Sequence, residues 1–224
     1  MQREGEIRIP SGCAVSGVFS KAGAPICGDT IIRSISVMHD RSNGLGGGFA
    51  GYGIYPEYKK YYAFHIFYDN SMSKQECEKF LERHFDIINL SKIPTRKHPK
   101  IMDEPLIWRY FVTPLPHKLS DSQLDEREFV ARCVIRVNTQ INGAYIFSSG
   151  KNMGVFKAVG FPEDVGEFYR LVILPIHPAG WVGPIPLLFW IFPSSTTGKS
   201  PPMTLTAVGL KCSDTPATCR QILK

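Results

Sequence analysis

The sequence of 224 residues predicts a mixed α+β protein, because helical and strand-like segments follow one another in an irregular order. Helical periodicity recurs along the chain, and alternating aromatic or apolar runs lie between the helical segments. Few of these runs keep the strict strand–helix–strand order of a parallel sheet. A composition of 43% hydrophobic and 21% charged residues suits one sizeable core or two small ones.

In the first part of the chain, a helix is predicted over 29–38, because its apolar side chains share one face. The segment 42–48 is rich in glycine and is predicted as a loop. The aromatic segments 49–55 and 60–68 are predicted strands. A Ser-x-x-Glu capping box then predicts a helix over 73–85.

In the second part, the sequence predicts a polar surface loop, a strand, an amphipathic helix, a pair of antiparallel strands and a short helix. The short helix begins at Pro162, which suits the first turn of a helix. The other elements span, in order, 91–105, 106–114, 125–138, and 144–147 with 154–159.

The net charge of +6 and the pI near 9.0 raise nucleic acid and anionic membranes as partners. Half of this charge comes from 171–224, which holds four basic residues, one acidic residue and eight of the 17 prolines. The other +3 is spread over the first 170 residues without a basic stripe, so no nucleic-acid partner is expected. The chain shows no spanning apolar segment and no C-x-x-C pair, which predicts a cytoplasmic protein with no membrane partner.

Other motifs are candidates for phosphate-binding, metal-binding or nucleophilic sites. The segment Thr197–Ser200 resembles the end of a phosphate-binding loop, but Pro193 stands where that pattern needs glycine. The glycine-rich loop at 44–51 is interpreted either as a phosphate cradle or, more simply, as tight turns. The histidines are scattered without metal-ligand spacing, so the sequence predicts no metal. Cys13 follows a polar leader and opens an apolar strand, where cysteine is commonly a small buried hydrophobe.

Four motifs together carry a family resemblance. They are Cys-Ala-Val-Ser-Gly-Val-Phe at 13–19, the run from Ser36 through His-Asp-Arg-Ser-Asn-Gly-Leu-Gly-Gly-Gly to Ala50, Tyr-Gly-Ile-Tyr-Pro-Glu-Tyr at 52–58, and Ser-Ser-Gly-Lys-Asn-Met-Gly-Val-Phe at 148–156. Over roughly 9–170 the chain resembles the class II glutamine amidotransferases. It is most similar to the stand-alone amidotransferase subunit of archaeal-type glutamate synthase.

The resemblance implies an N-terminal-nucleophile fold, a four-layer α/β/β/α sandwich, that is incomplete at the C-terminus. It implies a leader or propeptide at 1–12 and a partial amidotransferase domain at 13–170. Cys13 would be the nucleophile, and its α-amine would be the general base once the leader is removed. Arg41 matches the arginine that lies beside the nucleophile; the simpler interpretation is a surface ion pair with Asp29 or Asp40.

The implied activity is hydrolysis of glutamine to glutamate and ammonia. The ammonia would pass to the synthase subunit of glutamate synthase for glutamate synthesis. Flavin and iron–sulfur cofactors would belong to that partner, so no cofactor is expected in this chain. An α-amine pKa near ~8 and a thiol pKa near ~8.5 allow proton exchange at neutral pH.

The resemblance ends after Val172, where the family's substrate-binding Arg, Asn-Gly and Asp elements are absent. Back-translation of the tail, read one base earlier, allows Ala-His-Pro-Phe over 183–187, Leu-Asp-Phe-Ser-Val-Val-His-Asn-Gly-Glu-Ile-Ser-Ser-Tyr over 190–203, and Glu-Met-Phe-Gly-Tyr, then Cys, then Leu-Gln-Thr-Asp-Thr-Glu over 210–224. The resemblance implies that these are the family's oxyanion-hole and amine-binding segments, in order. We interpret 171–224 as an aberrant tail, frameshifted from about residue 183. One shift does not restore the Arg element around 171–182.

Two consequences are expected. Loss of even one oxyanion donor commonly costs about 10² to 10³ in rate, so the glutaminase activity of this chain is expected to be impaired. The Pro-rich tail is also expected to leave sheet edges and apolar surface uncovered. An inactive remnant or a regulatory protein-interaction module is the alternative function.

Overall fold

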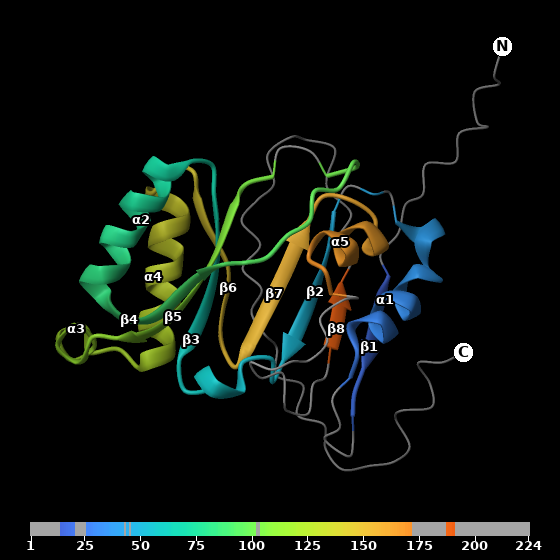
Figure 1. Ribbon diagram of the computed structural model, residues 1–224. Helices are drawn as coiled ribbons and strands as arrows, with labels where there is room; N and C mark the ends of the chain where they lie inside the picture. The colour runs from blue at the N-terminus through green and yellow to red at the C-terminus, as the bar shows by residue number, and fades with distance from the viewer. Residues whose placement is uncertain are drawn as a thin grey trace.

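The computed structural model describes residues 14–20, 26–42, 44, 46–101, 104–171 and the backbone of 187–190. It has the mixed α+β composition that the sequence predicts. Two antiparallel sheets are stacked on one another, and helices cover the outer face of each, so the layers follow the order α/β/β/α (Figure 1). Among the described residues, no helix is long and apolar enough to cross a membrane.

The first sheet contains the strand that follows Cys13. Its strand order is β1 (Val15–Val18), β8 (Leu187–Trp190), β2 (Gly47–Tyr52) and β7 (Met153–Ala158). β8 pairs antiparallel with both β1 and β2, so β1 and β2 run in the same direction.

The second sheet has the strand order β4 (Phe85–Lys92), β5 (Leu106–Pro114), β3 (Tyr62–Tyr68) and β6 (Ala144–Lys151). All of its pairs are antiparallel. β3 lies inside this sheet and has only one side chain that is not buried, which explains its almost continuous apolar sequence. β5 spans the residues that the sequence predicts.

The helices form two outer layers (Figure 1). α1 (Gly28–Ser36) and α5 (Pro162–Phe168) contact each other over the first sheet. α2 (Ser71–His84) and α4 (Glu126–Gln140) cover the second sheet, with α3 (Pro116–Ser122) beside α4. Two short 3₁₀ helices, η1 (His39–Arg41) and η2 (Pro56–Tyr58), lie in connections. Two apolar clusters form the core. One lies between the two sheets and extends beneath α1 and α5, and the other lies between the second sheet and helices α2 and α4.

The start of α2 differs from the prediction. Asn70, rather than Ser73, is the N-cap, and its side-chain oxygen accepts hydrogen bonds from the amides of Met72 and Ser73. The helix therefore begins three residues, almost one turn, earlier than a capping box at Ser73 requires. At α4 the predicted acidic start is correct, because the Asp125 carboxylate accepts from the amide of Glu128.

The predicted pairing of 144–147 with 154–159 is wrong. β6 pairs with β3 in the second sheet, whereas β7 pairs with β2 in the first sheet. The chain crosses between the sheets at Asn152, whose φ of 51° lies in the left-handed region. Asparagine tolerates this conformation better than most residues, which permits a one-residue crossover.

The segment 187–190 lies within the tail that the sequence marks as aberrant, and it occupies an interior position in the first sheet. This differs from the expectation that the tail leaves the sheet uncovered there. Strand pairing uses backbone amides and carbonyls, which every residue other than proline supplies. Because 187–190 contains no proline, it can pair on both sides whatever its side chains are.

Candidate functional site

Cys13 lies outside the described residues, but the structure places the residue that follows it. Ala14 is buried, with 6% of its surface exposed, and leads directly into β1. Val15 pairs with Trp190, Trp190 pairs with Gly48, and Gly48 pairs with Lys157. The beginning of β1 is therefore level with the beginning of β2 and the end of β7.

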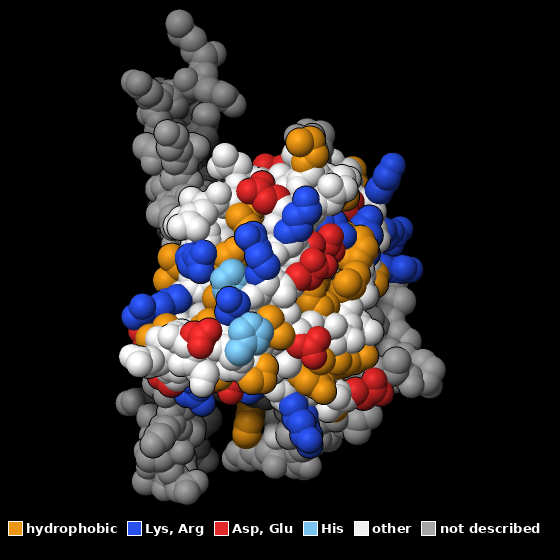
Figure 2. Space-filling view, turned by 90° about the vertical axis from the view of Figure 1, so that its left-hand side faces the viewer, with side chains coloured by type: hydrophobic (Ala, Val, Ile, Leu, Met, Phe, Trp, Pro, Cys, Tyr) orange, Lys and Arg blue, Asp and Glu red, His pale blue; other side chains and the backbone are white. Residues whose placement is uncertain are grey.

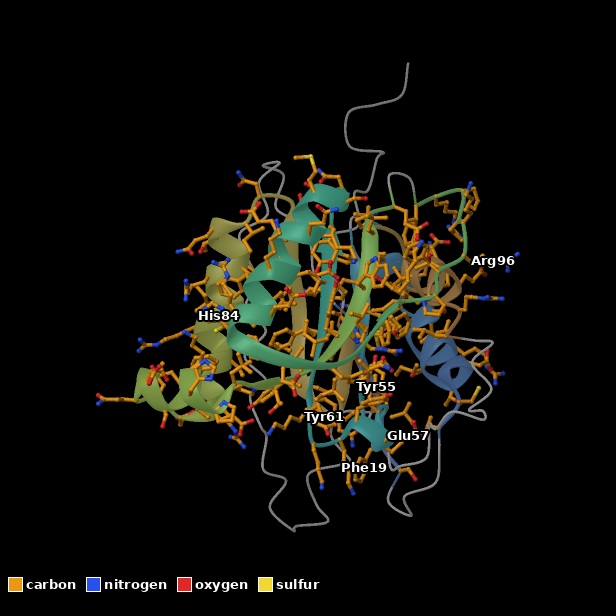
Figure 3. The ribbon with its side chains drawn as sticks, turned by 60° about the vertical axis from the view of Figure 1, so that its left-hand side comes forward. Phe19, Tyr55, Glu57, Tyr61, His84 and Arg96 are labelled. Carbon is orange, nitrogen blue, oxygen red and sulfur yellow. The ribbon has the colours of Figure 1, made fainter. Side chains whose placement is uncertain are left out.

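The opposite end of the first sheet is marked by Phe19, just after β1. Figure 3 shows Phe19 on the same side of the molecule as Tyr55, Glu57 and Tyr61. The start of β1 therefore lies at the far end of the strand from the β2–β3 connection. Of the family motifs, the one at 13–19 leads into β1 and the one bearing Arg41 leads into β2 at the same end of the first sheet, whereas the motif at 52–58 lies at the other end.

Arg41 is exposed in η1, in the connection that leads into β2. Neither Asp29 nor Asp40 pairs with it, and Asp29 instead binds Arg33 at 2.7 Å. Within the described part of the chain, Arg41 forms no ion pair. The surface ion pair that would explain Arg41 more simply is therefore not formed.

A contact with α5 holds the segment that carries Arg41. The imidazole Nδ1 of His39 lies 2.5 Å from a carboxylate oxygen of Glu163, and its ring stacks on Phe161 with centroids 4.2 Å apart. Gly44 packs against the ring of Phe161: a Cβ added at Gly44 would lie 2.9 Å from that ring, and the φ of Gly44 is 71°. The glycine there serves a close approach and a left-handed turn, which favours the tight-turn interpretation of this loop.

Buried charge lies on α5 next to this contact. Asp164 is 5% exposed and accepts from the ammonium of Lys100 at 3.0 Å and 3.2 Å. The imidazole of His98 lies 3.7 Å from Asp164 and 3.6 Å from Glu167. In the described ranges, no group of three or more side chains has the geometry of a metal site.

Lys157 is a residue that sequence reasoning missed. It lies on β7 opposite Gly48, level with the start of β1, and is half-buried. Burial lowers the pKa of its ammonium group, because the charged form loses hydration. A single lysine in a strand carries no sequence signal. Only the register across four strands shows that Lys157 is level with the start of β1, at the opposite edge of the sheet.

The motifs at 52–58 and 148–156 meet each other through Asn152. The backbone carbonyl of Asn152 accepts from the amide of Gly53 at 2.6 Å, and its side-chain oxygen accepts from the amide of Tyr55 at 2.9 Å. Both crossovers between the sheets are therefore tied together. These motifs serve the junction of the two sheets.

His65 extends this junction into the core. It is fully buried; its Nε2 lies 2.7 Å from the hydroxyl of Tyr55, and its Nδ1 lies 2.7 Å from the carbonyl oxygen of Val155. Because a carbonyl only accepts, Nδ1 carries the proton and Nε2 accepts from the Tyr55 hydroxyl. Burial lowers the pKa of His65 to about 3, so the ring is neutral at physiological pH.

Two neighbouring glycines allow a test of the packing at the start of β2. An added Cβ at Gly48 would lie 2.6 Å from the carbonyl oxygen of Phe156, a backbone atom that cannot rotate away. At Gly46 the nearest atom is 3.9 Å away. We expect Gly48→Ala to lower the free energy of unfolding by about 1–3 kcal/mol. Gly46→Ala, the matched control, should change it by less than about 0.5 kcal/mol in urea unfolding. Equal effects would contradict this packing.

Comparison with known proteins identifies a relative from an archaeon. An uncharacterized protein of Archaeoglobus fulgidus is 41% identical over 195 residues, which cover 80% of this chain and 51% of the relative. The chain thus spans about half the length of that protein. No family model matches the sequence.

Proposed function

We propose that this chain carries a class II glutamine amidotransferase domain, with Cys13 as its nucleophile. The observation that carries the proposal is the placement of the residue after Cys13. Ala14 is buried at the head of β1, level with the start of β2, and the connection bearing Arg41 leads into that same end of β2. A nucleophile at this position would be fixed by the sheet, at the end where the connection bearing Arg41 enters β2.

The layer order supports the same proposal. An α/β/β/α sandwich of two antiparallel sheets is the architecture that the N-terminal-nucleophile resemblance implies. Motifs at 52–58 and 148–156 come together although they are far apart in the sequence. Both motifs therefore lie at the junction of the two sheets.

The proposed chemistry uses groups of this chain alone. The α-amine of Cys13, exposed once 1–12 is removed, takes the thiol proton, and the thiolate attacks the side-chain amide carbon of glutamine. The C–N bond breaks, the nitrogen takes a proton and leaves as ammonia, and water hydrolyses the γ-glutamyl thioester to glutamate. Arg41 would favour the thiolate by its positive charge. A synthase subunit of glutamate synthase is the proposed acceptor of the ammonia.

The alternative is an inactive remnant or a regulatory protein-interaction module. The absence of the family's substrate-binding elements from the sequence favours it. In that case the protein would retain the fold and lose the reaction. Retention of Met1–Gly12 and absence of ammonia release would together support this alternative.

Selective labelling of cysteines tests the proposal. Burial raises the pKa of both Cys77 and Cys133 to about 11, so these thiols should react slowly at pH 7. A diazoketone analogue of glutamine is expected to label Cys13, as located by peptide mass spectrometry. Cys13→Ser should abolish that label, whereas the control Cys77→Ser should leave it. Intact mass should show loss of residues 1–12, and labelling without preference for Cys13 would reject the assignment.

A further inference from the structure

A basic surface lies where α2, α3 and α4 meet, far from the first sheet. The face formed by these helices shows Lys and Arg side chains around histidines, with acidic groups interspersed (Figure 2). His84 is the last residue of α2 and lies on this outer layer (Figure 3). Nothing in the proposed glutaminase reaction uses this surface.

His84 is held in one orientation there. Its Nδ1 lies 2.8 Å from the carbonyl oxygen of Phe80, and its Nε2 lies 3.3 Å from Nη1 of Arg136 on α4. Nδ1 therefore donates, and Nε2 accepts from the guanidinium. The imidazole stacks on the Phe80 ring with centroids 4.2 Å apart, and the Arg136 guanidinium lies 5.1 Å from the centroid of that same ring.

Three cations, one from each helix, lie within electrostatic range of His84: Arg136 on α4, which contacts its ring, Arg83, which precedes it on α2, and Lys118 on α3. Each is exposed, and none of them forms an ion pair with a residue that the structure describes. Burial lowers the pKa of His84, and the charges of Arg136, Arg83 and Lys118 lower it further. No carboxylate contributes to that shift.

The contrast with Arg132 is informative. Arg132 lies one turn before Arg136 on α4 and binds Glu128 at 2.6 Å. Among the described residues, Arg136 has no such carboxylate partner.

Arg83 donates Nε to the carbonyl of Lys79 at 2.9 Å, and with Lys79 and Glu82 it lines an open hollow of about 430 Å³. Arg83 near the end of α2 also complements the helix dipole, but Lys118 and Arg136 belong to other helices.

We propose that Arg83, Lys118 and Arg136 form a binding site for a tetrahedral dianion of the phosphate or sulfate type. Two guanidinium groups offer paired N–H donors that match adjacent oxygens of such an anion, and the lysine adds a third charge. The three cations repel one another, and a bound dianion would offset that repulsion. The ring of Phe80 supports both His84 and Arg136 beneath the site.

His84 makes the binding measurable. A dianion beside the imidazole favours its charged form, so binding raises the pKa of His84. By linkage, the protonated protein binds the anion more tightly. Protonated Nε2 becomes a donor, gives up its bond from Arg136 and can donate to an anion oxygen. Neither change requires Cys13, so this inference stands or fails apart from the proposed function.

The test is an NMR titration of the histidines in the full chain. Sulfate is the probe, because it stays doubly charged between pH 5 and 8; sodium chloride of equal ionic strength is the reference. We expect the titration midpoint of His84 to be at least about 0.5 pH unit higher in 20 mM sulfate than in chloride. Equal midpoints in the two salts would overturn the proposal.

Two matched variants separate binding from general screening. Arg136→Gln should remove the sulfate effect, whereas Arg132→Gln, on the same helix with its guanidinium already paired, should keep it. Persistence of the effect in Arg136→Gln would reject the site. Displacement of sulfate by inorganic phosphate would support free phosphate as the ligand, and displacement only by glycerol phosphate would support a phosphomonoester such as a lipid headgroup. Displacement by neither would reject phosphate-type ligands.

Discussion

Insertion of one base near codon 183 is expected to raise the glutaminase rate of this chain by at least about 10²-fold. The shifted tail then encodes the Asn-Gly segment to which the family resemblance assigns the oxyanion hole, and one such donor is commonly worth about 10² to 10³ in rate. The Arg element of 171–182 is not restored by one shift. We therefore expect kcat to rise while KM for glutamine stays high.

The measurement is ammonia release from glutamine by the two purified chains. Insertion of three bases at the same codon is the matched control, because it adds a residue without changing the frame, and it should give no gain. Cys13→Ala in the frame-restored chain should remove the gained activity. A restored chain no more active than the original would contradict the frameshift interpretation or the glutaminase assignment. Labelling of Cys13 by the glutamine analogue separates these two cases.

Acidification is expected to destabilise the protein through His65. The pKa of His65 is about 3 in the folded state and near ~6.5 when unfolded, so the unfolded chain binds more protons between these values. Stability from this group is complete above pH 6.5 and falls as the pH drops toward 3. The expected slope is about 1.4 kcal/mol per pH unit within that window.

Urea unfolding at several pH values measures this slope. His65→Asn should lower stability near neutral pH, since the hydrogen bonds of the His65 ring with the Tyr55 hydroxyl and the Val155 carbonyl are lost, and it should flatten the pH dependence. His117→Asn, on the exposed surface of α3, should leave the slope unchanged. If His65→Asn does not fold, NMR of the unmodified chain decides the matter. A His65 ring that titrates above pH 5 would refute the prediction.

The sequence predicts the elements whose signal is local. β5 and α5 follow from an apolar run and from Pro162 at a helix start, and both occur as expected. β4 at Phe85–Lys92 is missed, because its edge position leaves Ile88 and Leu90 exposed and removes the alternating pattern. The predicted pairing of β6 with β7 is wrong for another reason. Two consecutive strands show the same sequence pattern whether they pair with each other or enter different sheets.

The candidate site divides in the same way. Cys13 and Arg41 are proposed from motifs along the chain. The level of Lys157 relative to the start of β1 requires the register of four strands, and the contact between His39 and Glu163 joins residues far apart in the sequence. Such contacts are products of the fold, and no single segment of the chain contains them.

The position of β8 between β1 and β2 has a consequence for the order of folding. Among the described strands, β8 is the only neighbour of β1, and the paired residues Val15 and Trp190 come from opposite ends of the chain. Contacts this distant in sequence form late, because a large loop must close first. During synthesis, the strand that follows Cys13 must wait for residues 187–190 to leave the ribosome. The proposed removal of 1–12, where it depends on the finished sheet, would therefore occur only after β8 is in place.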